Sequence, residues 1–150
     1  MKKCSAILVL MGVVLLLSTC SREPKKNTNL ALYVSDVLVF EVGLESFFCG
    51  FILQDTEFRD TANNGTVTME VEDRDGVIFS LTWIATTERF TRAELTRGPH
   101  LEQRLLYAID QFDYSRFLRE PLGAFGQVTI VFDNGASVMR GQAPLLFKHR

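Results

Sequence analysis

Four acidic side chains occupy positions from which they could act together on one face of a sheet. Glu70 and Glu72 alternate along a strand-like run, and Asp55 and Glu57 fall on the apolar run before it. Paired carboxylates can perform acid–base catalysis or hold a divalent cation when burial separates their pKa values. Solvated acids on an exposed face explain the same pattern more simply. The sequence therefore favours a solvated face, and a hydrolase that uses this carboxylate pair is the alternative.

Arginine forms a second candidate group. After residue 20 the sequence contains eleven arginines and only three lysines. Four of the arginines lie within sixteen positions: Arg89, Arg92, Arg97 and Arg104. Because Arg makes forked contacts with carboxylates and phosphates, these four are the candidate contacts for an anion or an acidic partner. The competing interpretation is weak local pairing with the neighbouring acids Glu88, Glu94 and Glu102.

Cysteine and histidine offer little further chemistry. Cys49 lies among aromatic residues in Phe-Phe-Cys-Gly-Phe, which is typical of a small buried hydrophobe. A nucleophilic role would need a neighbouring base to lower the pKa of the thiol, and His100 and His149 form no recognisable pattern with it. The sequence has no GxSxG, HExxH, CxxC or glycine-rich phosphate loop. We therefore predict no metal and no cofactor, and we assign no catalytic residue.

The composition excludes several classes of protein. The chain has 150 residues, is 47% hydrophobic and 23% charged, and carries a formal net charge of -2. These values predict one folded domain and exclude a disordered or collagen-like chain. After residue 20 there are 14 basic and 18 acidic residues, a net charge of -4. This negative balance disfavours a nucleic-acid partner.

The first twenty residues are typical of an export signal. Lys2 and Lys3 precede an apolar run of eleven residues, from Ile7 to Leu17. A bilayer-spanning helix needs about 20 apolar residues, so this run is too short to be a stable span. A short basic segment followed by such a run fits a secretory signal peptide.

The sequence Leu17-Ser18-Thr19-Cys20 that follows resembles the lipobox of bacterial lipoproteins. The resemblance covers this N-terminal segment only. It implies that Cys20 becomes the first mature residue and carries acyl chains such as palmitate. Thr19 departs from the family, which usually has Gly, Ala or Ser at that position. Two alternatives stay open: cleavage after Cys20 that releases a soluble protein, or a secreted protein with a Cys20–Cys49 disulfide.

Turn signals predict a sheet in the remainder of the chain. Asn64-Gly65 and Asp75-Gly76 separate apolar runs, and Asn134-Gly135 separates a further pair. Asn-Gly and Asp-Gly supply the positive φ angles that two-residue hairpin turns need. We therefore expect a three-stranded antiparallel meander and a separate hairpin, formed by the runs 51–58, 66–73 and 77–85 and by the pair 127–132 and 137–142.

Helices are expected to cover one face of this sheet. Leu30 to Phe48 has apolar residues at helical spacing, although the β-branched run 37–42 would also suit a strand. Thr91 to Glu94 has capping-box spacing, so a short helix should begin there and end at Gly98-Pro99. A longer helix should follow from Leu101 to Arg119. The predicted fold class is α+β, with helices packed on one face of an antiparallel sheet.

Together these features predict a signal peptide at 1–19, a lipidated tether at 20–29 and a single α+β domain at 30–150. The predicted protein is a bacterial cell-envelope lipoprotein, anchored at an inner or outer membrane and facing the periplasm. We expect a non-catalytic binding or assembly module whose partners are the membrane, through its lipid anchor, and an envelope protein or the cell wall. An envelope hydrolase is the alternative function.

Overall fold

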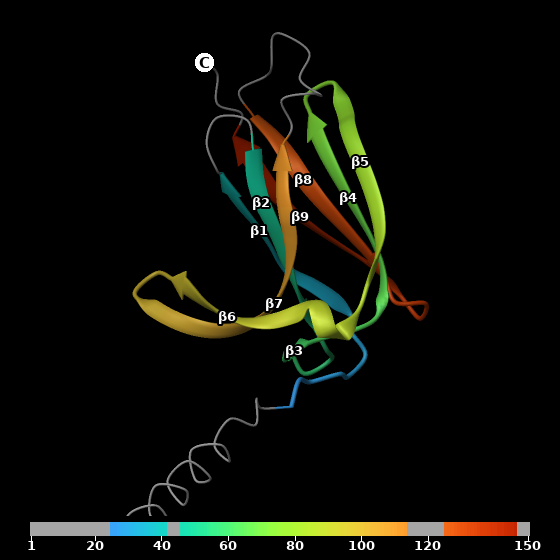
Figure 1. Ribbon diagram of the computed structural model, residues 1–150, viewed down its shortest axis with the longest axis vertical. Coiled ribbons are helices and arrows are strands. Elements are labelled where there is room, and N and C mark those ends of the chain that lie inside the picture. The colour runs from blue at the N-terminus through green and yellow to red at the C-terminus, as the bar shows by residue number, and fades with distance from the viewer. Residues whose placement is uncertain (1–24, 42–45, 114–124, 147–150) are drawn as a thin grey trace, which may run out of the picture.

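The computed structural model describes residues 25–41, 46–113 and 125–146. The predicted signal peptide and Cys20 lie outside these residues. Two antiparallel sheets pack face to face (Figure 1). The first sheet contains, in spatial order, β1 (Tyr33–Glu41), β2 (Ser46–Gln54), β7 (His100–Asp113) and β6 (Phe90–Arg97), with β3 (Asp60–Thr61) also paired to β2. The second contains β5 (Gly76–Ala85), β4 (Gly65–Asp73), β8 (Phe125–Asp133) and β9 (Val138–Leu146).

The second sheet confirms two of the predicted hairpins. Gly76 and Gly135 occupy the β4–β5 and β8–β9 turns with φ of +122° and +83°. Both angles lie where glycine is favoured, because it has no Cβ to clash. The alternation predicted for β4 is also confirmed, since Val67, Met69 and Val71 are all fully buried.

The predicted α+β class is wrong. The described residues contain no α-helix, and their one helical element is the 3-10 turn Thr87–Arg89. The helix expected over Leu30–Phe48 is replaced by β1 and the start of β2. The β-branched run within it pairs with β2 in antiparallel register, so β propensity prevails over the helical spacing of the apolar residues.

The helices expected from residues 91–97 and 101–119 are corrected in the same way. Residues 90–97 and 100–113 form β6 and β7, and Gly98-Pro99 turns between two strands instead of ending a helix. The burial pattern has a period of two, because Leu105 and Tyr107 are buried while Ala108 is exposed. Residues 114–119 of the predicted long helix lie outside the described part of the chain.

The predicted three-stranded meander is also wrong at its first turn. Gly65 does not close a hairpin, because β2 belongs to the first sheet and β4 to the second. A Cβ at Gly65 would clash with the carbonyl oxygen of Asp133. Glycine is therefore needed here for close approach of two backbones where the chain enters the second sheet.

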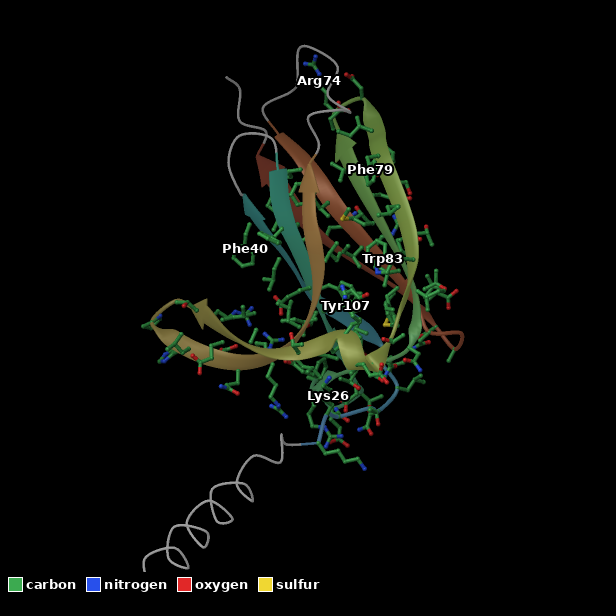
Figure 2. All side chains as sticks on the ribbon, in the orientation of Figure 1. Lys26, Phe40, Arg74, Phe79, Trp83 and Tyr107 are labelled. Atoms are coloured by element: carbon green, nitrogen blue, oxygen red, sulfur yellow. The ribbon has the colours of Figure 1, made fainter. Side chains whose placement is uncertain are left out.

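An aromatic cluster joins the two sheets. The ring of Phe51 on β2 stacks on Tyr107 of β7, with centroids 5.0 Å apart, and also contacts Phe132 of β8 at 5.9 Å. Phe90 meets Tyr107 edge to face at 5.1 Å. The Nε1 atom of Trp83, on β5, donates to the Tyr107 hydroxyl at 3.1 Å (Figure 2). Tyr107 thus links the core to the place where β6 begins.

The β6–β7 hairpin extends away from the sandwich (Figure 1). Strand β7 pairs with β2 through residues 106–113 and with β6 through residues 100–107. The two pairings overlap at Leu106 and Tyr107, so the hairpin continues beyond the part of β7 that β2 covers. This projection creates a concave surface beside β1 and β3.

Candidate functional site

A groove opens where the β6–β7 hairpin, β1 and the turn between β2 and β3 meet. We call it the hairpin groove, and its volume is about 620 Å³. The residues that matter for its chemistry are Asp36, Phe58, Asp60, Arg92, Arg97 and Arg104. Three of the four arginines selected from the sequence therefore line one groove.

Arg104 already has three acidic partners, Asp60 and Asp36 at close range and Glu102 at 3.8 Å. Its Nε and Nη2 atoms donate to the two carboxylate oxygens of Asp60 at 2.9 and 3.0 Å, and its Nη1 lies 3.2 Å from Asp36 Oδ2. Forked arginine–carboxylate pairs are among the strongest hydrogen-bonded arrangements in proteins. Because only 12% of the Arg104 side chain is exposed, it fixes the hairpin to β1 and β3 and does not offer its charge to a ligand.

The same contacts keep Asp60 ionised. Burial acts to raise the pKa of Asp60. The hydrogen bonds that Asp60 accepts from Arg104 and from the Leu105 N–H act in the opposite direction, as does the charge of Arg104. Together they outweigh burial, so the pKa of Asp60 is lowered. The pKa of Arg104 is raised in turn, first by its hydrogen bond with Asp60. A carboxylate held in this way is a poor general acid or base near neutral pH.

Among the described residues, Arg92 and Arg97 differ from Arg104 in having no acidic partner. Both are exposed, and neither forms an ion pair within the described ranges of the chain. Arg89, the fourth predicted contact, does not line the groove. Its Cζ atom lies 6.0 Å from the centre of the Tyr107 ring. The groove therefore leaves the charges of Arg92 and Arg97 available.

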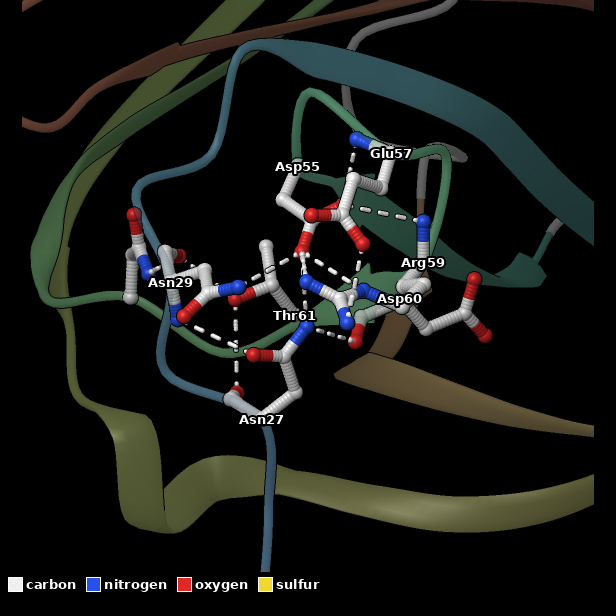
Figure 3. A network of polar contacts seen from close by, with 8 residues as sticks. Asn27, Asn29, Asp55, Glu57, Arg59, Asp60 and Thr61 are labelled. Atoms are coloured by element: carbon white, nitrogen blue, oxygen red, sulfur yellow. Dashed lines mark hydrogen bonds and ion pairs between the residues drawn. The ribbon is translucent and has the colours of Figure 1, made fainter.

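A buried carboxylate holds the first described residues against this end of the sandwich. Asp55 Oδ2 accepts hydrogen bonds from Asn27 Nδ2 and Asn29 Nδ2 at 3.1 and 3.0 Å and from Arg59 at 3.2 Å (Figure 3). Its Oδ1 accepts the N–H groups of Glu57 and Arg59. Burial acts to raise the pKa of Asp55, but these hydrogen bonds together hold it well below its usual range.

Asp60 connects this network to the groove. Asn27 Nδ2 donates to the Asp60 carbonyl oxygen at 3.1 Å, while the carboxylate of the same residue holds Arg104. Lys26 and Arg74 lie at opposite ends of the sandwich (Figure 2). We call the end that carries Lys26 the entry end. The chain thus enters the domain beside the hairpin groove.

An exposed aromatic pair adds an apolar surface to the groove. Phe58 is 69% exposed, and its ring stacks on Tyr33 with centroids 5.7 Å apart. Its φ of +57° lies in the left-handed region, which costs a non-glycine residue about 1–2 kcal/mol. Two backbone hydrogen bonds close the turn that enforces this angle. The Phe58 N–H donates to the Asp55 carbonyl oxygen, and the Asp55 N–H donates to the Arg59 carbonyl oxygen. Retained strain of this kind is common at binding sites.

The predicted carboxylate group does not assemble in the structure. Asp55 and Glu57 lie in the turn after β2, whereas Glu70 and Glu72 lie on β4 of the other sheet. Three acids line the groove with arginine, namely Glu102, which the sequence named as a local pairing partner, and Asp36 and Asp60, which it did not select. No local signal marks them, because Asp60 meets Arg104 across 44 positions of the chain.

Cys49 is buried in the core, as predicted. Burial raises the pKa of its thiol to about 12. Cys20, the predicted lipidation site, lies outside the described residues.

Within residues 25–41, 46–113 and 125–146, no three His, Cys, Asp or Glu side chains gather in a way that could hold a metal ion. No helix in that part of the chain is long and apolar enough to span a bilayer. The chain matches no protein-family model, and no curated protein matches it. The chemistry of the hairpin groove must therefore be inferred from its own geometry.

Proposed function

We propose that this protein is a membrane-tethered binding module of the bacterial cell envelope, and that its hairpin groove receives an anionic group of an envelope partner. One observation carries the proposal. Arg92 and Arg97 line the groove without an acidic partner among the described residues, whereas Arg104 is held by Asp60 and Asp36. A carboxylate or phosphate that enters the groove would meet the exposed guanidinium groups of Arg92 and Arg97, each of which can form a forked contact.

The proposed tether begins at Cys20. The support for acylation is the signal sequence and the lipobox-like residues that precede Cys20. Asn27 and Asn29 are already bonded to the domain, so the six residues from Cys20 to Lys25 would span at most about 22 Å. A tether of that length would keep the entry end, and the groove beside it, close to the membrane surface.

The mixed charge of the groove restricts its ligand. Asp36, Asp60 and Glu102 also line it, and they would repel a ligand with dense negative charge. A single carboxylate or phosphate flanked by neutral or basic groups fits better. The exposed ring of Phe58 offers a surface to a sugar ring or an apolar portion of the same ligand. Cell-wall peptides and envelope-protein segments with a single acidic residue both meet this description.

Binding is favoured over catalysis by the state of three ionisable groups. Asp55 and Asp60 have lowered pKa values, and burial raises the pKa of Cys49 to about 12. Near pH 7 all three groups keep their protonation state. A general acid or base, by contrast, works best with a pKa close to the operating pH.

The groove is tested with the purified full-length protein in detergent. Isothermal titration calorimetry at low salt would compare muropeptides, glycerol 3-phosphate and a short acidic peptide, which separates a cell-wall from a phosphate or a protein source. We expect one of these probes to bind, with affinity that falls as salt is added. The double variant R92Q/R97Q should lose at least tenfold in affinity, since each charged hydrogen bond contributes about 1.5–3 kcal/mol.

Arg140→Gln is the matched control, because Arg140 is an exposed arginine on β9, outside the groove. It should bind as the wild type does. If none of the three probes binds, or if R92Q/R97Q and R140Q bind equally well, the groove is not an anion site.

A further inference from the structure

Strand β5 is an exposed edge of the second sheet. It pairs with β4 on one side, and no strand in the described part of the chain pairs with its other side (Figure 1). Its ten residues, Gly76–Ala85, include no charged residue and no proline. Proteins usually protect exposed edges with charges, proline or bulges, because the unpaired N–H and C=O groups of an edge recruit further strands.

The other edge strands carry such protection. β1 contains Asp36 beside an irregularity in its pairing, β6 contains Arg92 and Glu94, and β9 contains Pro144. The bulge in the β4–β5 pair lies near the start of β5, and pairing is regular from Phe79 to Ala85. β5 therefore presents a regular, uncharged edge, and three of its apolar side chains are exposed: Val77, Leu81 and Ile84.

We propose that β5 pairs antiparallel with β5 of a second copy, so that two four-stranded sheets join across a two-fold axis at Leu81. Directly opposed residues in such a pair point to the same face, so a permitted register must oppose residues of one face. Phe79, Leu81 and Trp83 share the inner face, because they oppose the buried residues of β4.

The register in which the two-fold axis passes through Leu81 is self-complementary. Leu81 then opposes its own copy, Phe79 opposes Trp83, and Ser80 opposes Thr82 on the outer face. Aromatic pairs, aliphatic pairs and hydroxyl pairs are the cross-strand combinations that stabilise sheets. Centring the pair on Thr82 would instead oppose Ser80 with Ile84, which leaves a polar group against an apolar one.

The composition of β5 agrees with a second copy as its partner. The strand has no charged residue, so it meets no like charge when it opposes its own copy. A two-fold contact repeats each opposed pair, so the Phe79–Trp83 and Ser80–Thr82 pairs each form twice. This self-complementarity favours a second copy over an unrelated strand.

Cysteine cross-linking of the purified full-length protein tests the register. Opposed Cα atoms in an antiparallel pair lie about 4.5–5.5 Å apart, within the range that a disulfide can bridge. Leu81→Cys should therefore give a disulfide-linked dimer when copper phenanthroline is added. Ile84→Cys should not, although Ile84 is more exposed than Leu81, because its two copies would lie about 20 Å apart. The wild type controls for the native cysteines.

Sedimentation velocity provides a second measurement that needs no cysteine. The wild type should sediment as a dimer, and S80K/T82K should sediment as a folded monomer because it opposes lysine with lysine in this register. The proposal is overturned if Ile84→Cys links as efficiently as Leu81→Cys, if neither variant links, or if the wild type is a monomer. A dimer that persists in S80K/T82K would also overturn it. None of these results depends on lipidation of Cys20 or on the groove.

Discussion

Arg104 on β7 and Asp60 on β3 form a two-point pair, at 2.9 and 3.0 Å, that fastens the projecting hairpin to the entry end of the sandwich. The Leu105 N–H donates to the same carboxylate at 2.9 Å. The carbonyl oxygen of Asp60 also accepts a hydrogen bond from Asn27. One residue therefore sets the position of the groove relative to the segment through which the chain enters the domain.

Asp60→Asn should lower the free energy of unfolding by about 2–3 kcal/mol, because it weakens a shielded charged pair and leaves Arg104 less compensated. Asp75→Asn is the control, since the Arg74–Asp75 pair is exposed and 3.7 Å long. This variant should lower the free energy of unfolding by less than about 0.5 kcal/mol. Urea unfolding followed by circular dichroism measures both. Equal losses would show that the Asp60–Arg104 pair contributes no more than a surface pair.

Stability should fall in acid. The pKa values of Asp55 and Asp60 in the folded protein lie below the ordinary value of 3.8, so their ionised forms favour the folded state. This contribution is complete above the unfolded-state pKa and is lost as the pH falls through the lower folded-state pKa. The urea midpoint of the wild type should therefore decline between about pH 5 and about pH 2. The urea midpoint of Asp55→Asn should decline less over the same pH range. If the midpoints of the wild type and the variant fall in parallel, Asp55 does not have this role.

Phe58→Gly should be more stable than Phe58→Ala by about 1 kcal/mol. Both variants lose the contact with Tyr33, but only alanine keeps a side chain at a φ of +57°. Thermal unfolding of the two variants measures the difference. If the alanine variant is as stable as the glycine variant, position 58 is not strained in solution.

The second sheet could be predicted because its signals are local. Asp75-Gly76 and Asn134-Gly135 specify two hairpin turns, and the alternation of Val67, Met69 and Val71 identifies the buried face of β4. Each of these patterns lies within a few residues of the structure that it determines. Turn chemistry and side-chain period are sufficient in such cases.

The first sheet and the groove could not be predicted in that way. Gly98 has a φ of +60°, which suits the end of a helix as well as a hairpin turn. Leu101 and Leu105 have helical spacing, yet Leu101 is exposed and Leu105 is buried on a strand. Pairing of β2 with β7, like the contact of Asp60 with Arg104, joins distant parts of the chain. Tertiary pairing of this kind overrides local propensity.

The tether is tested most directly by the intact mass of the mature protein purified from bacterial membranes. The proposed function predicts a polypeptide that begins at Cys20 and carries the additional mass of acyl chains, and it predicts that Cys20→Ala moves the protein into the soluble fraction. A mature chain that begins at Ser21 without lipid, or that still begins at Met1, would contradict it.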